Sequence, residues 1–216
     1  MAPPGPPSKR FPDRRAAGRA LAERLREIDL DAPVVVALPR GGVPVAHEVA
    51  QALGAPLDIA LVRKLGAPGR PELGIGALGE DGTAVLDGDT IAALGVTRAQ
   101  IEAIVEREAG ELERRRRLYR GDRPPVDVSG RTVVLVDDGI ATGVTTIAAA
   151  RMLRERGAAD VTVAVPVCPA VAVERLRNQL GDIVYLIAPT RFGGVGAWYD
   201  DFTQTSDAEV VELLRI

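Results

Sequence analysis

Short, mostly apolar runs alternate along this chain with stretches in which apolar residues recur every three or four positions. A wholly apolar run of four to six residues is typical of a strand buried on both faces, whereas the wider spacing is typical of an amphipathic helix. These runs, apolar except for Asp58 and Thr162, predict strands at 34–38, 57–62, 133–136, 161–165 and 183–187. The periodic stretches predict helices at 13–28, about 43–53, 97–119, about 144–156 and 170–180. This alternation favours an α/β fold built on a mostly parallel sheet.

Two of these helices carry signals for where they begin. Asp13 is suited to cap the first helix, because its carboxylate can accept a hydrogen bond from a free backbone N–H. Thr97 and Gln100 have the spacing of a capping box at the start of the long helix. The buried stripe of that helix is expected at Ile101, Ile104, Val105, Ala109 and Leu112.

The segment 65–82 interrupts the alternation because it is rich in Gly and Pro. Such a composition predicts a long mobile loop, with a short strand at 75–78 inside it. Asp81 and Gly82 form a turn signal, so residues 83–86 are the expected hairpin partner of that short strand.

The composition excludes several classes of protein. The 216 residues are enough for one sizeable domain, and 27 basic against 30 acidic residues give no sign of nucleic-acid binding. A single Cys168 and a single His47 exclude an internal disulfide and a cysteine- or histidine-rich metal site. No apolar run approaches the ~20 residues of a membrane helix, so we expect a cytoplasmic protein without a membrane or nucleic-acid partner. Residues 1–12 lack an apolar signal core and are expected to be a disordered lead-in to a single domain at 13–216.

The most informative stretch is 133–146, where a predicted strand ends in two adjacent carboxylates, Asp137 and Asp138. A short loop rich in glycine and hydroxyl groups follows, and a helix begins directly after it. Backbone N–H groups at a helix start favour an anion such as phosphate. Two neighbouring carboxylates repel phosphate, but they suit ribose hydroxyls or a Mg²⁺ ion. The alternative is an ordinary strand-to-helix turn with an accidental acid pair.

This stretch resembles the phosphoribosyl pyrophosphate (PRPP) motif of the type I phosphoribosyltransferases: four hydrophobic residues, two acids, a short spacer, Thr-Gly and further threonines. The resemblance implies that family's α/β fold, a parallel sheet flanked by helices. It also implies a flexible lid loop, at about 65–82, and a small C-terminal hood, at about 189–202. The layout is most similar to family members of undefined substrate. The expected PRPP-binding residues of this stretch are Asp137, Asp138, Gly139, Ala141, Thr142, Gly143, Val144, Thr145 and Thr146.

Two further segments follow strands and are expected at the same edge of the sheet, where ligands bind in such folds. Pro39, Arg40, Gly41 and Gly42 end the first strand, and the glycines allow backbone N–H groups to approach an anion closely. By resemblance they are the pyrophosphate loop. Arg63 and Lys64 end the next predicted strand and can neutralise a pyrophosphate leaving group. The alternatives are a common Gly-rich turn and a solvated strand end.

Near the C-terminus, four of the chain's seven aromatic residues fall between 192 and 202. The segment is similar to the hood of 6-oxopurine phosphoribosyltransferases, which implies that Arg191, Phe192, Val195 and Trp198 hold the base. The alternative is an aromatic packing patch. Position 141 departs from that group: the 6-oxopurine enzymes usually have an Asp just before the Thr-Gly pair, as proton acceptor for the base, whereas this chain has Ala141, which is more like the adenine-type pattern.

The resemblance implies transfer of ribose 5-phosphate from PRPP to a nitrogenous base, with a purine favoured, with Mg²⁺ as cofactor and with release of pyrophosphate. The expected catalytic residues are Asp137, Asp138, Arg40 and Lys64, and the expected metal ligands are Asp137 and Asp138. A non-catalytic PRPP sensor is the alternative that Ala141 keeps open. A homo-oligomer is expected by resemblance alone. The run Arg114–Arg117 is interpreted as a solvated helix face.

Overall fold

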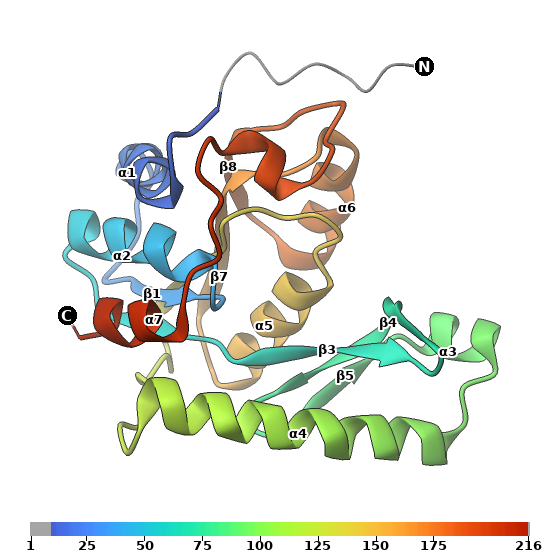
Figure 1. Ribbon diagram of the computed structural model, residues 1–216. Coiled ribbons are helices and arrows are strands. Elements are labelled where there is room, and N and C mark those ends of the chain that lie inside the picture. Colours follow the sequence, from blue (N-terminus) through green and yellow to red (C-terminus); the bar gives the residue numbers. More distant parts are fainter. Residues whose placement is uncertain (1–9, 216) are drawn as a thin grey trace.

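The computed structural model describes residues 10–215. Its centre is a five-stranded parallel sheet in the order β2-β1-β6-β7-β8 (Figure 1). The strands are β1 (Val34–Ala37), β2 (Leu57–Ile59), β6 (Thr132–Val136), β7 (Asp160–Val167) and β8 (Ile183–Ile187). The α/β prediction is confirmed, and β8 has the predicted bounds.

Helices cover both faces of this sheet, which explains why its strands are mostly apolar. On one face, α1 (Arg14–Leu25) and α2 (Gly42–Leu53) pack against Val35 and Val134. On the other face, α5 (Val144–Glu155) and α6 (Ala170–Leu180) pack against Val34 and Val133. Consecutive residues of one strand therefore bury their side chains in two different cores.

A second sheet is antiparallel and lies beside the first, below it in Figure 1. It consists of β3 (Val62–Ala67), β4 (Arg70–Gly79) and β5 (Ala84–Leu86) and packs against α5. The prediction of one strand at 57–62 is wrong, because the chain leaves the parallel sheet after β2 and enters the second sheet at Val62. The prediction of a loop at 65–82 is also wrong, because most of these residues belong to β3 and β4, but the short strand expected at 75–78 lies within β4 and pairs with β5 as its hairpin partner. The turn at Asp81 and Gly82 is confirmed, with the Thr83 N–H donating to Asp81 Oδ1 at 2.9 Å.

The glycines of this hairpin allow close backbone contacts rather than a loose loop. A Cβ on Gly66 would lie 2.4 Å from the Pro71 carbonyl oxygen, and one on Gly76 would lie 2.4 Å from that of Val85. Only glycine permits such approach. The Gly-rich composition thus has a packing cause that the loop prediction did not consider.

Two more helices complete the second layer. The first, α3 (Gly88–Leu94), was not expected, whereas α4 (Arg98–Arg120) begins with the predicted capping box of Thr97 and Gln100. Ile104 and Leu112 are buried as predicted, but Ala109 is exposed. The arginines 114–117 pair along the helix with Glu111 and Glu113, as expected of a solvated face.

Arg120 fastens this second layer to the parallel sheet. Its guanidinium forms ion pairs with Asp58 of β2 and Glu80 at the end of β4, and it donates to the Ile59 carbonyl. Only 4% of the Arg120 side chain is exposed. A buried cation with two carboxylate partners and a carbonyl acceptor is satisfied, as burial requires.

The first described residues pack on the segment that follows β8, near the carboxyl edge of the sheet. Phe11 forms a β-bridge with Tyr199, and its carbonyl accepts from the Asp200 N–H at 2.9 Å. The expected lead-in therefore extends too far, since Phe11 and Pro12 belong to the fold; residues 1–9 lie outside the described residues. The C-terminal segment passes through a short 3-10 helix, η1 (Val195–Trp198), and ends in α7 (Asp207–Leu213), which packs against α2 and α4.

Candidate active site

The loops that follow β1 and β6 touch each other at the carboxyl edge of the parallel sheet. The Leu38 N–H donates to the Val136 carbonyl at 2.8 Å. A Cβ on Gly41 would lie 2.1 Å from Asp138 Oδ2, and one on Gly42 would lie 2.7 Å from the Val136 carbonyl oxygen. Glycine at both positions is therefore what lets the first loop lie directly against the acid pair. The peptide bond between Pro39 and Arg40 in this loop is cis.

The acid pair is half-buried beneath this contact. Asp137 Oδ1 accepts the Asp138 N–H at 2.8 Å, which fixes the first carboxylate against its own loop. Burial, followed by the neighbouring charge of Asp138, raises the pKa of the Asp137 carboxyl well above its usual range. Burial also raises the pKa of Asp138, although the Arg14 guanidinium opposes this shift.

Arg14 is the partner of the acid pair that the sequence did not reveal. Its Nε donates to Asp138 Oδ2 at 2.8 Å, and 11% and 13% of the two side chains are exposed. The guanidinium also stacks on Phe202, 3.9 Å from the ring centroid, and donates to the Thr203 carbonyl at 2.8 Å. The Tyr199 hydroxyl donates to the Asp138 carbonyl at 2.6 Å. Nothing near Arg14 in the sequence signals this role, because its partner lies 124 positions away.

The loop after the acid pair opens α5 in the manner expected of a phosphate site. Gly143 has a φ of +79° and occupies the N-cap position, so the free N–H groups of the first turn follow directly. Ala141 and Thr142 are exposed, Thr145 is half-buried and Thr146 is buried. Arg175 of α6 donates to the Thr142 carbonyl at 2.7 Å and supports the loop from behind.

Of the three cations expected at the site, Arg40 and Lys64 lie near its loops and Arg63 does not. Arg40 lies beside Asp207, with 3.5 Å between Nη1 and Oδ1. Lys64 donates to the Glu72 carbonyl at 2.9 Å. Gly74 lies between Lys64 and the start of α5: a Cβ added to Gly74 would lie 3.5 Å from Lys64 Cδ and 3.8 Å from Val144 Cγ1. Lys64 is therefore near the phosphate loop.

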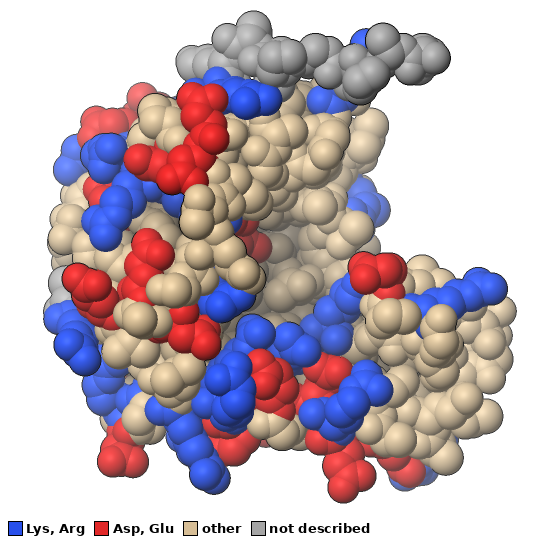
Figure 2. Space-filling view, viewed as in Figure 1, with Lys and Arg blue, Asp and Glu red and all other residues tan. Residues whose placement is uncertain are grey.

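Arg63 points away from this group. Alternate residues of a strand face opposite sides, and Arg63 makes two hydrogen bonds with Glu108 Oε2 of α4, at 2.9 and 2.7 Å. The structure therefore brings Lys64, and not Arg63, toward the loops of the site. Figure 2 shows the resulting hollow between the parallel sheet and the second layer, with basic side chains along its lower rim and an acidic group inside it.

The four residues expected to hold a base lie in different surroundings. Val195 packs on the acid-pair loop, since a Cβ on Gly139 would lie 2.6 Å from its Cγ1. Trp198 is 8% exposed, clusters with Phe11 and Tyr199, and donates from Nε1 to the Phe192 carbonyl at 3.0 Å. Phe192 is half-buried and Arg191 is exposed. The packing favours a structural role for Trp198 and places Val195, of these four residues, against the acid-pair loop.

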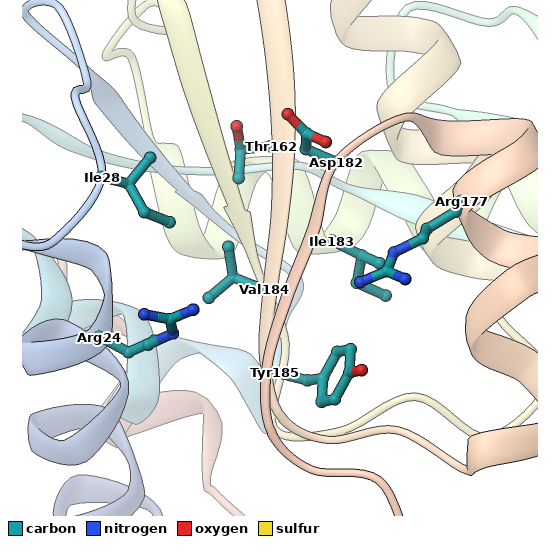
Figure 3. A pocket seen from close by; sticks show the side chains of 8 residues that line it. All are labelled: Arg24, Ile28, Thr162, Arg177, Asp182, Ile183, Val184 and Tyr185. Carbon is teal, nitrogen blue, oxygen red and sulfur yellow. The ribbon is translucent and has the colours of Figure 1, made fainter.

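Two cavities lie near the parallel sheet. One, of about 490 Å³, opens beside the phosphate loop and is lined by Gly74, Leu86, Val144, Arg151 and Arg175 among others. The other, of about 360 Å³, lies at the amino ends of β7 and β8, where Figure 3 shows Arg24 and Arg177 on either side of β8. The second cavity is thus at the opposite edge of the sheet from the acid pair.

The comparisons with known proteins identify the family. The phosphoribosyl transferase domain model matches residues 12–186, which is most of the chain. The chain therefore belongs to the phosphoribosyltransferases, and within them to the type I family, as a member of undefined substrate. The parallel sheet with helices on both faces agrees with that family's fold.

Individual relatives extend this result. Two Mycobacterium tuberculosis proteins, from strains CDC 1551 and H37Rv, each named "Putative phosphoribosyl transferase", are 48% identical over 206 residues, covering 95% of this chain and 46% of theirs. The chain thus spans about half the length of these relatives. A crystal structure of TT1426 from Thermus thermophilus is 46% identical, with a TM-score of 0.85, over 95% of this chain and 97% of that chain. A uracil phosphoribosyltransferase from Streptomyces griseus is 47% identical over 58 residues, 27% of this chain and 28% of that protein.

Two features of residues 10–215 bear on the expected partners. No helix among residues 10–215 is long and apolar enough to cross a membrane. In the same part of the chain, no group of three or more His, Cys, Asp or Glu side chains is placed to hold a metal ion by itself.

Proposed function

We propose that this protein transfers ribose 5-phosphate from PRPP to a nitrogenous base, with release of pyrophosphate. The observation that carries the proposal is the contact between the acid pair and the glycine loop after β1, with the start of α5 beside them. This arrangement offers carboxylates for ribose hydroxyls between two sets of backbone N–H groups suited to phosphates. Membership of the phosphoribosyltransferase family supports PRPP as the substrate.

Each part of PRPP has a group suited to it. Residues 141–146 would hold the 5-phosphate through N–H groups at the start of α5. Asp137 and Asp138 would orient the ribose hydroxyls, and Arg40 and Lys64 would take up negative charge on the pyrophosphate as the bond from C1 to oxygen breaks. The base nitrogen then bonds to C1. Because Ala141 has no ionisable group, the proton of the base would pass to water or to the released pyrophosphate.

The donor set fits Mg²⁺. This ion prefers oxygen ligands and usually takes one or two carboxylates together with substrate phosphates and water. Asp137 is the better ligand of the pair, because Arg14 already occupies Oδ2 of Asp138. Bound together with PRPP, Mg²⁺ would neutralise charge on the leaving pyrophosphate.

A purine is the favoured acceptor. The support is the similarity of residues 191–198 to the hood of purine enzymes, and Ala141 is likewise found in the adenine-type pattern. The local match to a uracil phosphoribosyltransferase makes uracil a necessary member of any substrate panel. A cytoplasmic location and a homo-oligomeric assembly stay predictions from the sequence.

The test measures pyrophosphate release from PRPP and Mg²⁺ with adenine, hypoxanthine, guanine, xanthine, uracil and orotate. We expect release with one purine and a fall of about 100-fold or more in the Asp137→Asn, Asp138→Asn double variant, because its amides lack the charge of the acid pair. Glu212→Gln, an exposed change on α7, is the control and should release pyrophosphate at the normal rate. Normal turnover by the double variant would refute the assignment of the site.

A non-catalytic PRPP sensor is the second candidate, and Ala141 is the observation that favours it. A sensor binds PRPP by calorimetry, loses this binding in the double variant, and releases no pyrophosphate with any base. Absence of PRPP binding to the unaltered protein would exclude both candidates.

A further inference from the structure

Arg40 of the expected pyrophosphate loop does not stand alone in the structure. Its Nη1 lies 3.5 Å from Oδ1 of Asp207, a residue in the first turn of α7. The same oxygen accepts a hydrogen bond from the hydroxyl of Tyr119, near the end of α4. Three elements that are far apart in the sequence thus meet at one carboxylate oxygen.

Tyr119 fixes the position of this carboxylate. The Tyr119 side chain is buried, and burial, followed by its hydrogen bond to Asp207, raises its pKa to about 12. The hydroxyl is therefore a neutral donor at physiological pH, and it holds Asp207 from the side opposite to solvent. Ser206, the N-cap of α7, holds the backbone next to it by accepting from the Glu209 N–H at 3.1 Å.

The pair between Arg40 and Asp207 is partly open to water, with 28% of the first side chain and 35% of the second exposed. A half-exposed pair at this distance is weak and exchanges partners readily. A pyrophosphate group that reached Arg40 would meet the guanidinium and, next to it, a fixed negative charge.

We propose that Asp207 is a positioning residue that acts as the resident counter-ion of Arg40 and competes with the pyrophosphate end of PRPP for this arginine. This inference rests on the proposed function, because it requires Arg40 to bind that end of the substrate. When no substrate is present, the ion pair with Asp207 orients the Arg40 guanidinium across the expected pyrophosphate loop. Its charge also weakens the hold of the site on pyrophosphate, which favours release of that product.

The test is binding of inorganic pyrophosphate, measured by calorimetry, to variants at both positions. Asp207→Asn removes the charge but keeps an oxygen that can accept from Tyr119, so the fold is preserved. We expect it to tighten pyrophosphate binding about two- to fivefold, the range for a half-exposed ion pair. In the transferase reaction the KM for PRPP should fall by a similar factor, without a matching rise in kcat. Glu212→Gln removes an equal charge from the exposed side of the same helix and should leave both values unchanged.

A double-variant cycle shows whether Asp207 acts through Arg40. Arg40→Gln alone should weaken pyrophosphate binding, and Asp207→Asn should have no further effect in the Arg40→Gln background. Unchanged or weaker binding in Asp207→Asn, with the expected loss in Arg40→Gln, would overturn this inference and leave the proposed function standing. Equal tightening in both backgrounds would also overturn it, because the effect would then be one of overall charge. No loss in Arg40→Gln would refute the role of Arg40 itself.

Discussion

The two charged halves of the site are held in opposite ways. The acidic half, Asp137 and Asp138, is largely enclosed: its partner Arg14 lies 2.8 Å from Asp138, and only 11% and 13% of these two side chains are exposed. The basic half, Arg40 and Lys64, is paired at 3.5 Å with Asp207 and at 3.9 Å with Glu72, and the Glu72 side chain is 99% exposed.

This difference indicates what each half can do. A buried ion pair resists change, because separating it leaves an unpaired charge in a medium of low dielectric constant. A solvent-exposed pair is weak, so its cation is free to exchange one anion for another. The acidic half is therefore suited to hold a fixed orientation for a neutral, hydroxyl-bearing group. The basic half is suited to receive and release a highly charged one.

The largest effect is expected from breaking the buried pair. Arg14→Met keeps much of the side-chain volume but leaves Asp138 without its cation, next to a second carboxylate. We expect the free energy of unfolding to fall by about 3 kcal/mol, and Tm to fall by roughly 6–12 °C for a chain of this size. Urea unfolding at pH 7 measures the first quantity and calorimetry the second.

The matched control is Arg19→Met on the same helix. Arg19 pairs with Glu48 at 3.4 Å, but 60% of its side chain is exposed, so its loss should cost less than about 0.5 kcal/mol. Adding Asp138→Asn to Arg14→Met should restore part of the lost stability. If Arg14→Met and Arg19→Met were equally stable, the acidic half would not depend on Arg14.

A smaller effect of opposite sign is expected at Asp137. Because burial and the charge of Asp138 raise the pKa of Asp137, its ionised form is disfavoured in the folded protein. The wild-type protein therefore loses stability as the pH rises from the usual Asp pKa of 3.8, which applies to the unfolded chain, through the raised pKa of Asp137 in the folded protein. Asp137→Asn avoids this loss, and we expect it to be more stable at pH 7 by about 1 kcal/mol while impairing activity.

Urea unfolding in the presence of a chelator, at pH 7 and again near pH 4, measures this difference. The advantage of Asp137→Asn should shrink at the lower pH, where the carboxyl of the folded wild-type protein is protonated and that of the unfolded chain, with its usual pKa of 3.8, is partly protonated. Asp127→Asn is the contrasting variant, since hydrogen bonds from Ser129 lower the pKa of that exposed carboxyl; it should show no gain at pH 7. An equal advantage at both pH values would mean that charge is not the cause.

The sequence predicted the parallel sheet and the acid-pair loop because both depend on neighbouring residues. Val133 to Val136 are buried on both faces of the sheet, and an uninterrupted apolar run predicts such burial. Gly143 opens α5 as the motif indicated. The second sheet was missed because its glycines have a tertiary cause: Gly66 allows the Pro71 backbone to approach, which composition alone presents as a loop signal.

The charge partners of the site could not be predicted for a different reason. Arg14 and Asp207 meet Asp138 and Arg40 only after both ends of the chain have packed against the rest of the fold. Among many arginines and carboxylates, no local pattern marks these two. Pairing across more than a hundred positions is set by the fold, so it requires the structure.

The smallest effect is expected from the most exposed contact of the basic half. Glu72→Gln removes the carboxylate 3.9 Å from Lys64 but keeps the Glu72 carbonyl, which accepts from Lys64 Nζ at 2.9 Å. Because the side chain is almost fully in water, Tm should change by less than about 1 °C and pyrophosphate affinity by less than about twofold. Thermal unfolding and calorimetry with inorganic pyrophosphate measure both. A change as large as that of Asp207→Asn would show that exposure does not separate the two partners of the basic half. If Glu72→Gln has a small effect and Asp207→Asn a clear one, the pyrophosphate affinity of the basic half is controlled by Asp207, the carboxylate that the buried Tyr119 hydroxyl holds in place.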